Sequence, residues 1–318
     1  MENHDTIDAD YSSLWGIPVT VCVATICDNS TIIGASDRML TAGNVQFEPT
    51  FPKIYPLTTS ITAMVSGDMT IQSELISDMH LNLNTLLKSQ PPPDWFNVKD
   101  IAYLYAGYFA ALKSKRAERD YLYPVNLTQE TFITKQKELS AELVNKLTIE
   151  LINYSLPSSS VIFAGIDKTG PHLFVVNDGD VTCQDAVGFA AIGAGWYHAS
   201  SHLMFSRYAR NQSLPRALIL TYTSKKRAEV APGVGSETDM FMIGPALGSY
   251  ILIKDEIVKD LQKMYQDSVK SHARADIKAE RKANEYVEQI NRGAAVPTEQ
   301  NITKDGDGET SASEEEKN

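Results

Sequence analysis

Two histidines, His198 and His202, are spaced so that their side chains could bind a metal ion together. They lie four residues apart in a segment that we expect to be helical, so their imidazoles would share one face of the helix. Two imidazoles at this spacing can bind one metal ion. No glutamate adjoins His198 and the sequence shows no third ligand, so partly exposed helix histidines are the simpler interpretation.

The motifs of several common enzyme classes are incomplete in this chain. Gly193-Ala194-Gly195 and Gly233-Val234-Gly235 are short glycine turns that do not continue into a dinucleotide- or phosphate-binding loop. No Gly-x-Ser-x-Gly elbow supplies a hydrolase serine. The three cysteines, Cys22, Cys27 and Cys183, lack the paired spacing of a zinc site and are too few for a disulfide framework. We therefore predict no cofactor and no metal.

The charge balance of the chain is acidic. Its 318 residues include 29 Lys and Arg against 40 Asp and Glu, which gives a formal net charge of −11. This balance argues against a nucleic-acid partner, because a phosphate-backbone binder needs clustered basic residues. The N-terminal residues 1–13 are polar and acidic, and no run of apolar residues reaches the length of a membrane span. We expect a cytoplasmic protein with no membrane partner.

Strands are predicted where β-branched residues cluster between turns. Two such runs, Val19–Ile26 and Thr31–Ala35, flank an Asp28-Asn29-Ser30 turn and predict a β-hairpin. Other strands are predicted at 53–57, 60–65, 161–166, 172–176, 189–192, 240–243 and 250–253.

Helices are predicted where apolar residues recur at steps of three and four. The first carries Ile71, Leu75, Met79 and Leu86 on one stripe and ends at Pro91-Pro92-Pro93, because proline cannot continue a helix. The others are predicted over about 98–119, 128–152, 196–204, 215–227 and 254–290.

In chain order these elements form strands, a helix block, strands, a helix pair and strands. Helices grouped in blocks, without βαβ alternation, indicate an α+β layered domain. We divide the chain into a flexible leader (1–18), a main domain (19–253) with a helix-rich segment (97–155), a long charged helix (254–292) and an acidic tail (293–318). From Thr298 on, seven acidic residues, two basic residues and no aromatic residue predict disorder.

Several short segments occur in an order that resembles a known family. They are Thr20-Val-Cys-Val-Ala24, Gly34-Ala-Ser-Asp37-Arg38, Thr41-Ala42-Gly43, Pro52-Lys53-Ile54, Val65-Ser66-Gly67 and the turn Phe189–Gly195. Together they resemble the β-type proteasome subunits and the HslV and Anbu groups of N-terminal-nucleophile hydrolases, over about residues 19–253. The resemblance implies a four-layer αββα sandwich, with two antiparallel sheets face to face and helices outside.

The resemblance also implies a role for individual residues. Thr20 would be the nucleophile and the first residue of the mature chain, with its own α-amine as the base. Lys53 would favour the neutral form of that amine, and Asp37 would hold the lysine in place. The backbone N–H of Gly67 would stabilise the oxyanion, and Thr41 and Gly43 would pair with a substrate peptide as an added strand.

The register of the first strand leaves the identity of the nucleophile open. Counting back from Asp37 without a gap places Val21 in the nucleophile position, where a methyl group would replace the hydroxyl. A one-residue bulge would return Thr20 to that position. Cys22 lies on the same strand face as Thr20 and is a third candidate, with a buried structural thiol as the alternative. Ala194 stands where active members of the family usually carry a serine.

Two functions therefore stay open on the sequence. The first is a proteasome-like threonine-type amidohydrolase or peptidase, in which removal of the leader frees Thr20 to cleave peptide bonds. The second is a catalytically inactive subunit of the same fold with a structural or assembly role. The resemblance implies a peptide or protein substrate, assembly into a homo-oligomeric ring or stack, and an ATP-dependent unfoldase as a further candidate partner. We expect the helix 254–290 to dock on a neighbouring subunit.

Overall fold

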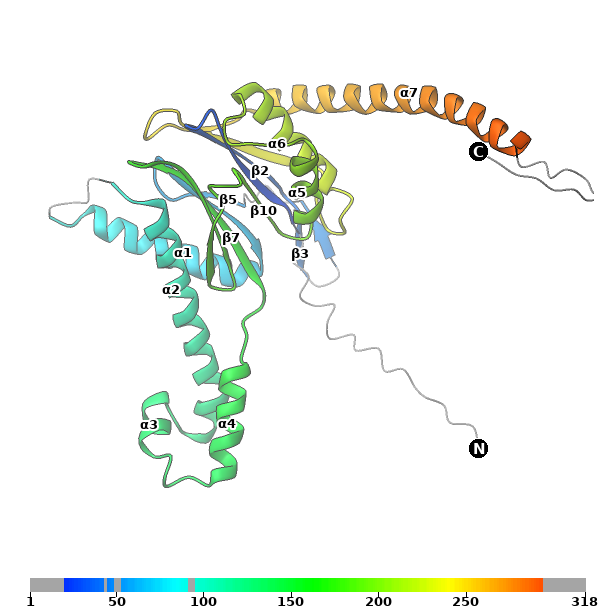
Figure 1. The fold of residues 1–318 in the computed structure, drawn as a ribbon. Coiled ribbons are helices and arrows are strands. Elements are labelled where there is room, and N and C mark those ends of the chain that lie inside the picture. The colour runs from blue at the N-terminus through cyan, green and yellow to red at the C-terminus, as the bar shows by residue number, and fades with distance from the viewer. Residues whose placement is uncertain (1–19, 43–44, 49–52, 91–94, 294–318) are drawn as a thin grey trace, which may run out of the picture. The chain divides into compact units, whose positions relative to one another are not determined.

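The computed structural model describes residues 20–42, 45–48, 53–90 and 95–293. Within them the chain forms an α+β fold of two five-stranded antiparallel sheets packed with helices (Figure 1). The predicted leader, Gly43, Pro91-Pro92-Pro93 and the acidic tail from residue 294 lie outside the described residues.

The first sheet contains, in spatial order, β10 (Phe189–Ile192), β1 (Cys22–Cys27), β2 (Thr31–Asp37), β11 (Thr238–Ile243) and β12 (Tyr250–Leu252). The predicted β1–β2 hairpin is confirmed. Its turn residues Asp28 and Asn29 have φ values of 49° and 53°. Asp and Asn tolerate this left-handed conformation, which suits a tight turn between antiparallel strands.

The second sheet contains, in spatial order, β5 (Ile54–Pro56), β6 (Ile61–Gly67), β7 (Ser159–Asp167), β8 (Gly170–Asn177) and β9 (Asp180–Cys183). Strand β9 was not predicted, because its side chains are mostly exposed and lack an apolar alternation. A separate two-stranded ribbon pairs β3 (Leu40–Ala42) with β4 (Val45–Phe47).

The apolar core separates into layers. Residues of both sheets, among them Ile26, Phe241, Met64 and Ile162, form one cluster between the sheets. Helices α1 (Met69–Leu87) and α2 (Val98–Ala117) pack on the outer face of the second sheet. Helices α5 (Trp196–Phe205) and α6 (Leu214–Ala228) cover the first sheet. The predicted αββα layering is confirmed (Figure 1).

The single helix predicted over 128–152 is wrong. The structure has two helices, α3 (Gln129–Thr134) and α4 (Ala141–Asn153), after a π-helical turn (Glu118–Leu122) and a 3₁₀ turn (Tyr123–Val125). Ser140 begins α4, since its hydroxyl accepts a hydrogen bond from the Leu143 N–H at 3.3 Å. Leu139, Leu143, Leu147 and Leu151 recur at steps of four on both sides of Ser140, and this spacing hid the N-cap. The placement of Leu86 on the inward stripe of α1 is also wrong, because Leu86 is 41% exposed.

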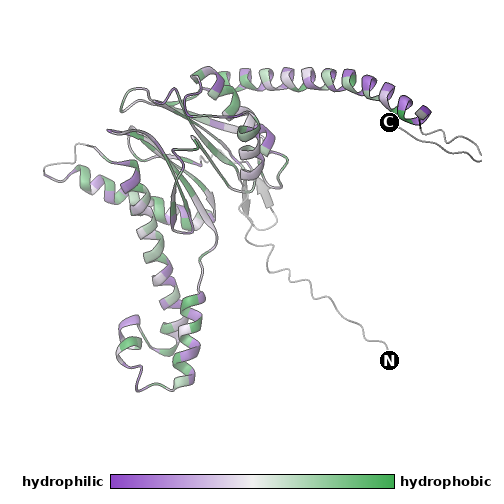
Figure 2. Ribbon diagram, viewed as in Figure 1, coloured by the Kyte–Doolittle hydropathy of each residue, from purple (hydrophilic) through white to green (hydrophobic). Residues whose placement is uncertain are grey.

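The charged helix predicted after residue 254 is confirmed as α7 (Asp255–Gly293). The sequence suggests a drier side of this helix formed by Ile257, Leu261, Tyr265 and Ile277, but only Leu261 is buried, while Ile257 is 46% and Ile277 53% exposed. Hydrophilic and hydrophobic residues alternate around α7 (Figure 2). The chain divides into two compact units after Gln262, inside α7. No helix among the described residues is long and apolar enough to cross a membrane.

Candidate active site

Strands β1 and β2 place Thr20 and Asp37 side by side. Thr20 directly precedes Val21 and β1, and Asp37 is the last residue of β2. The Asp37 N–H donates a hydrogen bond to the Val21 carbonyl at 3.2 Å, which continues the pairing of the two strands by one residue. Thr20 is 1% exposed and Asp37 is fully buried. The hairpin therefore brings a hydroxyl and a carboxylate into the protein interior.

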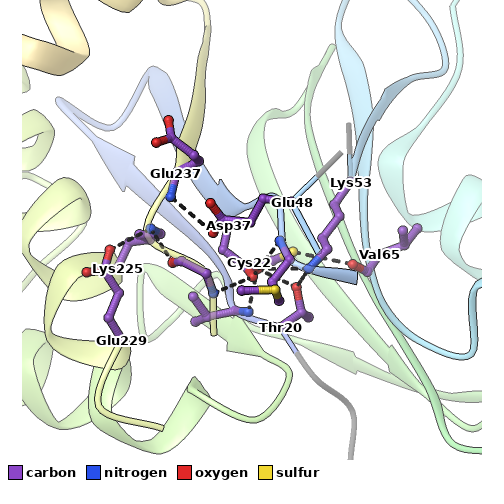
Figure 3. A network of polar contacts seen from close by, with 12 residues as sticks. Thr20, Cys22, Asp37, Glu48, Lys53, Val65, Lys225, Glu229 and Glu237 are labelled. Carbon is purple, nitrogen blue, oxygen red and sulfur yellow. Dashed lines mark hydrogen bonds and ion pairs between the residues drawn. The ribbon is translucent and has the colours of Figure 1, made fainter. Parts of the chain in front are cut away.

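The Thr20 hydroxyl lies between the predicted charged residues. It donates a hydrogen bond to Asp37 Oδ1 and accepts one from Lys53 Nζ (Figure 3). Lys53 Nζ also forms an ion pair with Asp37 Oδ1 at 3.0 Å and is almost fully buried. Lys53 precedes β5, and its carbonyl accepts from the Val65 N–H of β6 at 3.0 Å. The structure thus brings together three of the predicted site residues from three separate segments.

The structure also separates the three candidate nucleophiles. Thr20 contacts Lys53. The side chain of Val21 instead lies next to Gly195, since a Cβ added to Gly195 would be 3.0 Å from the Cβ of Val21. The Val21 backbone N–H donates to Asp37 Oδ1 at 2.9 Å. Cys22 is fully buried, its thiol donates to the Val65 carbonyl at 3.4 Å, and burial raises its pKa far above the usual range. A thiol in this state is a poor nucleophile, because the thiolate is the reactive form.

The carboxylate of Asp37 accepts hydrogen bonds on both oxygens. Beyond the contacts of Oδ1, its Oδ2 accepts from the Met39 N–H at 3.1 Å and from the Gly235 N–H at 2.9 Å. Such donors compensate for the water that a buried carboxylate loses. Asp37 therefore ties the end of β2 to the loop that precedes β11.

A second buried lysine, Lys225, holds that loop, and the sequence analysis missed it. Its Nζ donates to the carbonyls of Gly235 at 2.8 Å and Ser236 at 3.1 Å, and pairs with Glu229 at 2.6 Å (Figure 3). Burial lowers the pKa of Lys225, and the Glu229 carboxylate opposes this shift. The available signal was spacing, because Lys225 follows Thr221 by four residues on the buried stripe of α6.

The turn between β10 and α5 closes over Thr20. Gly195 N–H donates to the Thr20 carbonyl at 3.2 Å. Gly193 has φ +87°, and an added Cβ would lie 2.4 Å from that carbonyl oxygen and 2.6 Å from Thr20 Cγ2. It would also lie 2.9 Å from the hydroxyl of Ser66, which is buried and has no hydrogen-bond partner among the described residues. Only glycine fits at position 193.

Gly67 ends β6 in a conformation that also requires glycine. Its φ is +101°, and an added Cβ would lie 2.2 Å from the Ser158 carbonyl oxygen. Asp68 follows it as the N-cap of α1, and the Asp68 carboxylate accepts hydrogen bonds from the N–H groups of Thr70 and Ile71. The oxyanion role of Gly67 stays a prediction. Thr41 lies in β3, and its pairing with a substrate also stays a prediction.

The histidine pair on α5 does not form a metal site in the described part of the chain. His198 is exposed and His202 is half-buried. The pKa of His202 is lowered to about 4, mainly because the imidazole is buried. The positive charges of Arg227 and Arg216 lower it further. These guanidinium groups would also oppose a bound cation. No group of three His, Cys, Asp or Glu side chains among the described residues could hold a metal ion.

Comparison of the chain with protein-family models found no match, and comparison with curated proteins found no relative. The structure shows the α+β architecture with its two five-stranded antiparallel sheets. Membership of the hydrolase family that the short segments resemble is therefore a proposal.

Proposed function

We propose that this chain is an amidohydrolase of the N-terminal-nucleophile type, in which removal of residues 1–19 makes Thr20 the nucleophile. One observation carries the proposal: the Thr20 hydroxyl contacts both the Lys53 ammonium and the Asp37 carboxylate inside the protein. A hydroxyl bonded to a buried ion pair is an unusual use of charge for stability alone, because burying ions is costly.

The chemistry requires a base next to the hydroxyl. The freed α-amine of Thr20, with a reference pKa of about 8, would take the hydroxyl proton as Oγ1 attacks a substrate carbonyl carbon. The tetrahedral intermediate then collapses, its C–N bond breaks, and the proton passes to the leaving amine. Water hydrolyses the resulting ester, releases the carboxylic acid and restores the hydroxyl.

The surrounding groups would tune these steps. The Lys53 ammonium disfavours a second positive charge nearby, so it would keep the α-amine in its neutral form. Asp37 fixes Lys53 through the ion pair at 3.0 Å. The Gly67 N–H, at the strand end just before α1, is the candidate donor to the oxyanion.

The test combines intact mass with peptide hydrolysis. We expect the purified wild-type chain to lose residues 1–19 and to hydrolyse internally quenched peptides. Thr20→Val keeps the shape of the side chain and removes the hydroxyl, so we expect it to abolish hydrolysis. Thr25→Val is the matched control, because Thr25 is equally buried but bonds to Thr221, outside this cluster. It should retain activity.

The alternative function is a catalytically inactive subunit of the same fold. A wild-type chain that keeps residues 1–19 and hydrolyses no peptide would favour it over the hydrolase. If Thr20→Val keeps these residues while the wild type loses them, the cleavage itself depends on the Thr20 hydroxyl.

A further inference from the structure

A cavity of about 480 Å³ opens beside β10, outside the cluster around Thr20. Its lining comes from β7, β8, β9, β10, α5 and the loop between β9 and β10, and includes the five consecutive residues Phe189–Gly193. This volume is within the range of ligand-binding pockets.

The consecutive lining residues identify the part of β10 that faces the cavity. Side chains on a strand alternate between the two faces, so one face alone would contribute every second residue. Five residues in a row indicate that the cavity follows the edge of the strand. Strand β10 is at the end of its sheet and pairs with β1 alone among the described strands. Its other edge has no strand partner among them, and the cavity beside it gives an added strand room to pair, although Phe189, Ala190 and Ile192 are themselves buried.

This edge leads to Thr20. Strand β10 runs toward Gly193, which lines the cavity. Gly193 also contacts Thr20, because the absence of a Cβ at position 193 leaves room for Thr20 Cγ2. Strand β1 has β2 on one side and β10 on the other. The segment predicted to pair with substrate, β3, follows β2 in the chain, whereas β10 pairs with the edge of β1 that faces away from β2.

We infer that the free edge of β10 binds the leaving-group side of a peptide substrate in extended form, with an uncharged, bulky side chain in the adjoining cavity. The inference rests on the proposed function, since Thr20 defines the two sides of the cleaved bond. A leaving segment runs away from Thr20, whereas β10 runs toward it, so the added strand is antiparallel. The four residues of β10 span about 13 Å, enough for a peptide of three or four residues.

The lining determines the preferred side chain. None of the described residues that line the cavity is charged. Val187, Trp196 and Met204 contribute apolar surface and are 47%, 51% and 63% exposed. Contact with an apolar side chain would remove this surface from water, whereas a charged side chain would find polar groups such as Asn177 and Gln184 but no counter-charge.

Calorimetric titration of the purified wild-type protein with leaving-side fragments tests the inference. The probes are three tripeptide amides with a free N-terminus, which differ only in a first residue of phenylalanine, aspartate or lysine. We expect the phenylalanine peptide to bind at least ~10-fold more tightly than either charged peptide, because the cavity offers no counter-charge. Trp196→Ala should weaken the phenylalanine peptide by about 3- to 10-fold, since it removes aromatic surface.

A reciprocal charge change locates the binding site. Thr182 lines the cavity and is exposed, so Thr182→Asp should favour the lysine peptide over the aspartate peptide by about 2- to 5-fold, and Thr182→Lys should reverse this order. Thr134→Asp and Thr134→Lys are the matched controls, because Thr134 is exposed on α3 outside the cavity. They should leave the order unchanged.

The outcomes separate this inference from the proposed function, because the titration needs no hydrolysis. Binding that follows the Thr182 charge supports the inference even if the chain cleaves no peptide. Hydrolysis with no binding of the three probes, or with a preference that ignores the Thr182 and Trp196 variants, overturns it and leaves the proposed function standing. A Trp196→Ala change in oligomeric state with no change in peptide affinity also overturns it, in favour of a second copy of the chain as the occupant.

Discussion

The strongest test of the buried cluster is Asp37→Asn. The substitution keeps the shape of the side chain and removes its charge. Asp37 accepts five hydrogen bonds, from Thr20, Val21, Met39, Lys53 and Gly235. The amide would place an NH₂ group toward donors whichever way it turns, because donors approach both carboxylate oxygens. It would also leave the ammonium of the buried lysine without a counter-charge.

The magnitude follows from burial. Removing one partner of a buried ion pair costs about 3–5 kcal/mol, because the other charge stays buried and unpaired. A loss near 4 kcal/mol is a large part of a typical unfolding free energy of about 5–15 kcal/mol. At about 2–4 °C per kcal/mol, the melting temperature should fall by about 8–16 °C.

Thermal and urea unfolding measure this loss, and Asp239→Asn is the matched control. Asp239 pairs with Arg38, and this pair is less buried, with side chains 17% and 25% exposed, so its loss should be smaller, about 1–3 kcal/mol. The double variant Asp37→Asn, Lys53→Met should lose less stability than the sum of the two single variants, because it buries no lone charge. Equal losses for Asp37→Asn and Asp239→Asn, or strict additivity in the double variant, would refute the ion-pair reasoning.

Three further predictions follow. Gly193→Ala should displace Thr20 and reduce peptide hydrolysis by about 100-fold, and unchanged kcat would contradict the tight fit. The hydrogen bond to Asp185 raises the pKa of His172 above 6.5, so folding stability should fall as pH rises through that pKa; His172→Gln should abolish this slope in urea unfolding. Iodoacetamide should label Cys183 in the native chain and the two buried thiols only after denaturation, as mass spectrometry would show.

The sequence predicted the layers well because their signals are local. The β1–β2 hairpin has β-branched runs around an Asp-Asn turn, and α1 carries buried residues at helical spacing. The edge strand β9 escaped because one exposed strand offers no alternation. The start of α4 at Ser140 escaped because Leu139, Leu143, Leu147 and Leu151 keep helical spacing through it. The Ser140 side chain caps the N-terminus of α4, so a new helix starts there although the apolar periodicity predicts one continuous helix.

The candidate site was harder to predict because its register depends on one residue. Ungapped counting favoured Val21, whereas in the structure Thr20 reaches Lys53. The difference comes from the end of the hairpin, where the Val21 N–H and the Thr20 hydroxyl share one oxygen of Asp37. The pattern of apolar residues in the sequence cannot predict such hydrogen bonds. Sequence could give the residue types, but the three-dimensional pairing was needed to choose between neighbours.

Lys225 shows why the support of the site lies beyond sequence reasoning. It stands with Lys226 and Arg227 in the last turn of α6, where basic residues suit the helix dipole and are usually exposed. Instead, its ammonium binds two carbonyls of the loop whose Gly235 N–H reaches Asp37. Asp37 and Gly235 are 198 residues apart. The two buried lysines therefore act on different oxygens of the same carboxylate: Lys53 contacts Oδ1, and Lys225 holds the loop whose Gly235 N–H donates to Oδ2. Together they fix the acceptor of the Thr20 hydroxyl.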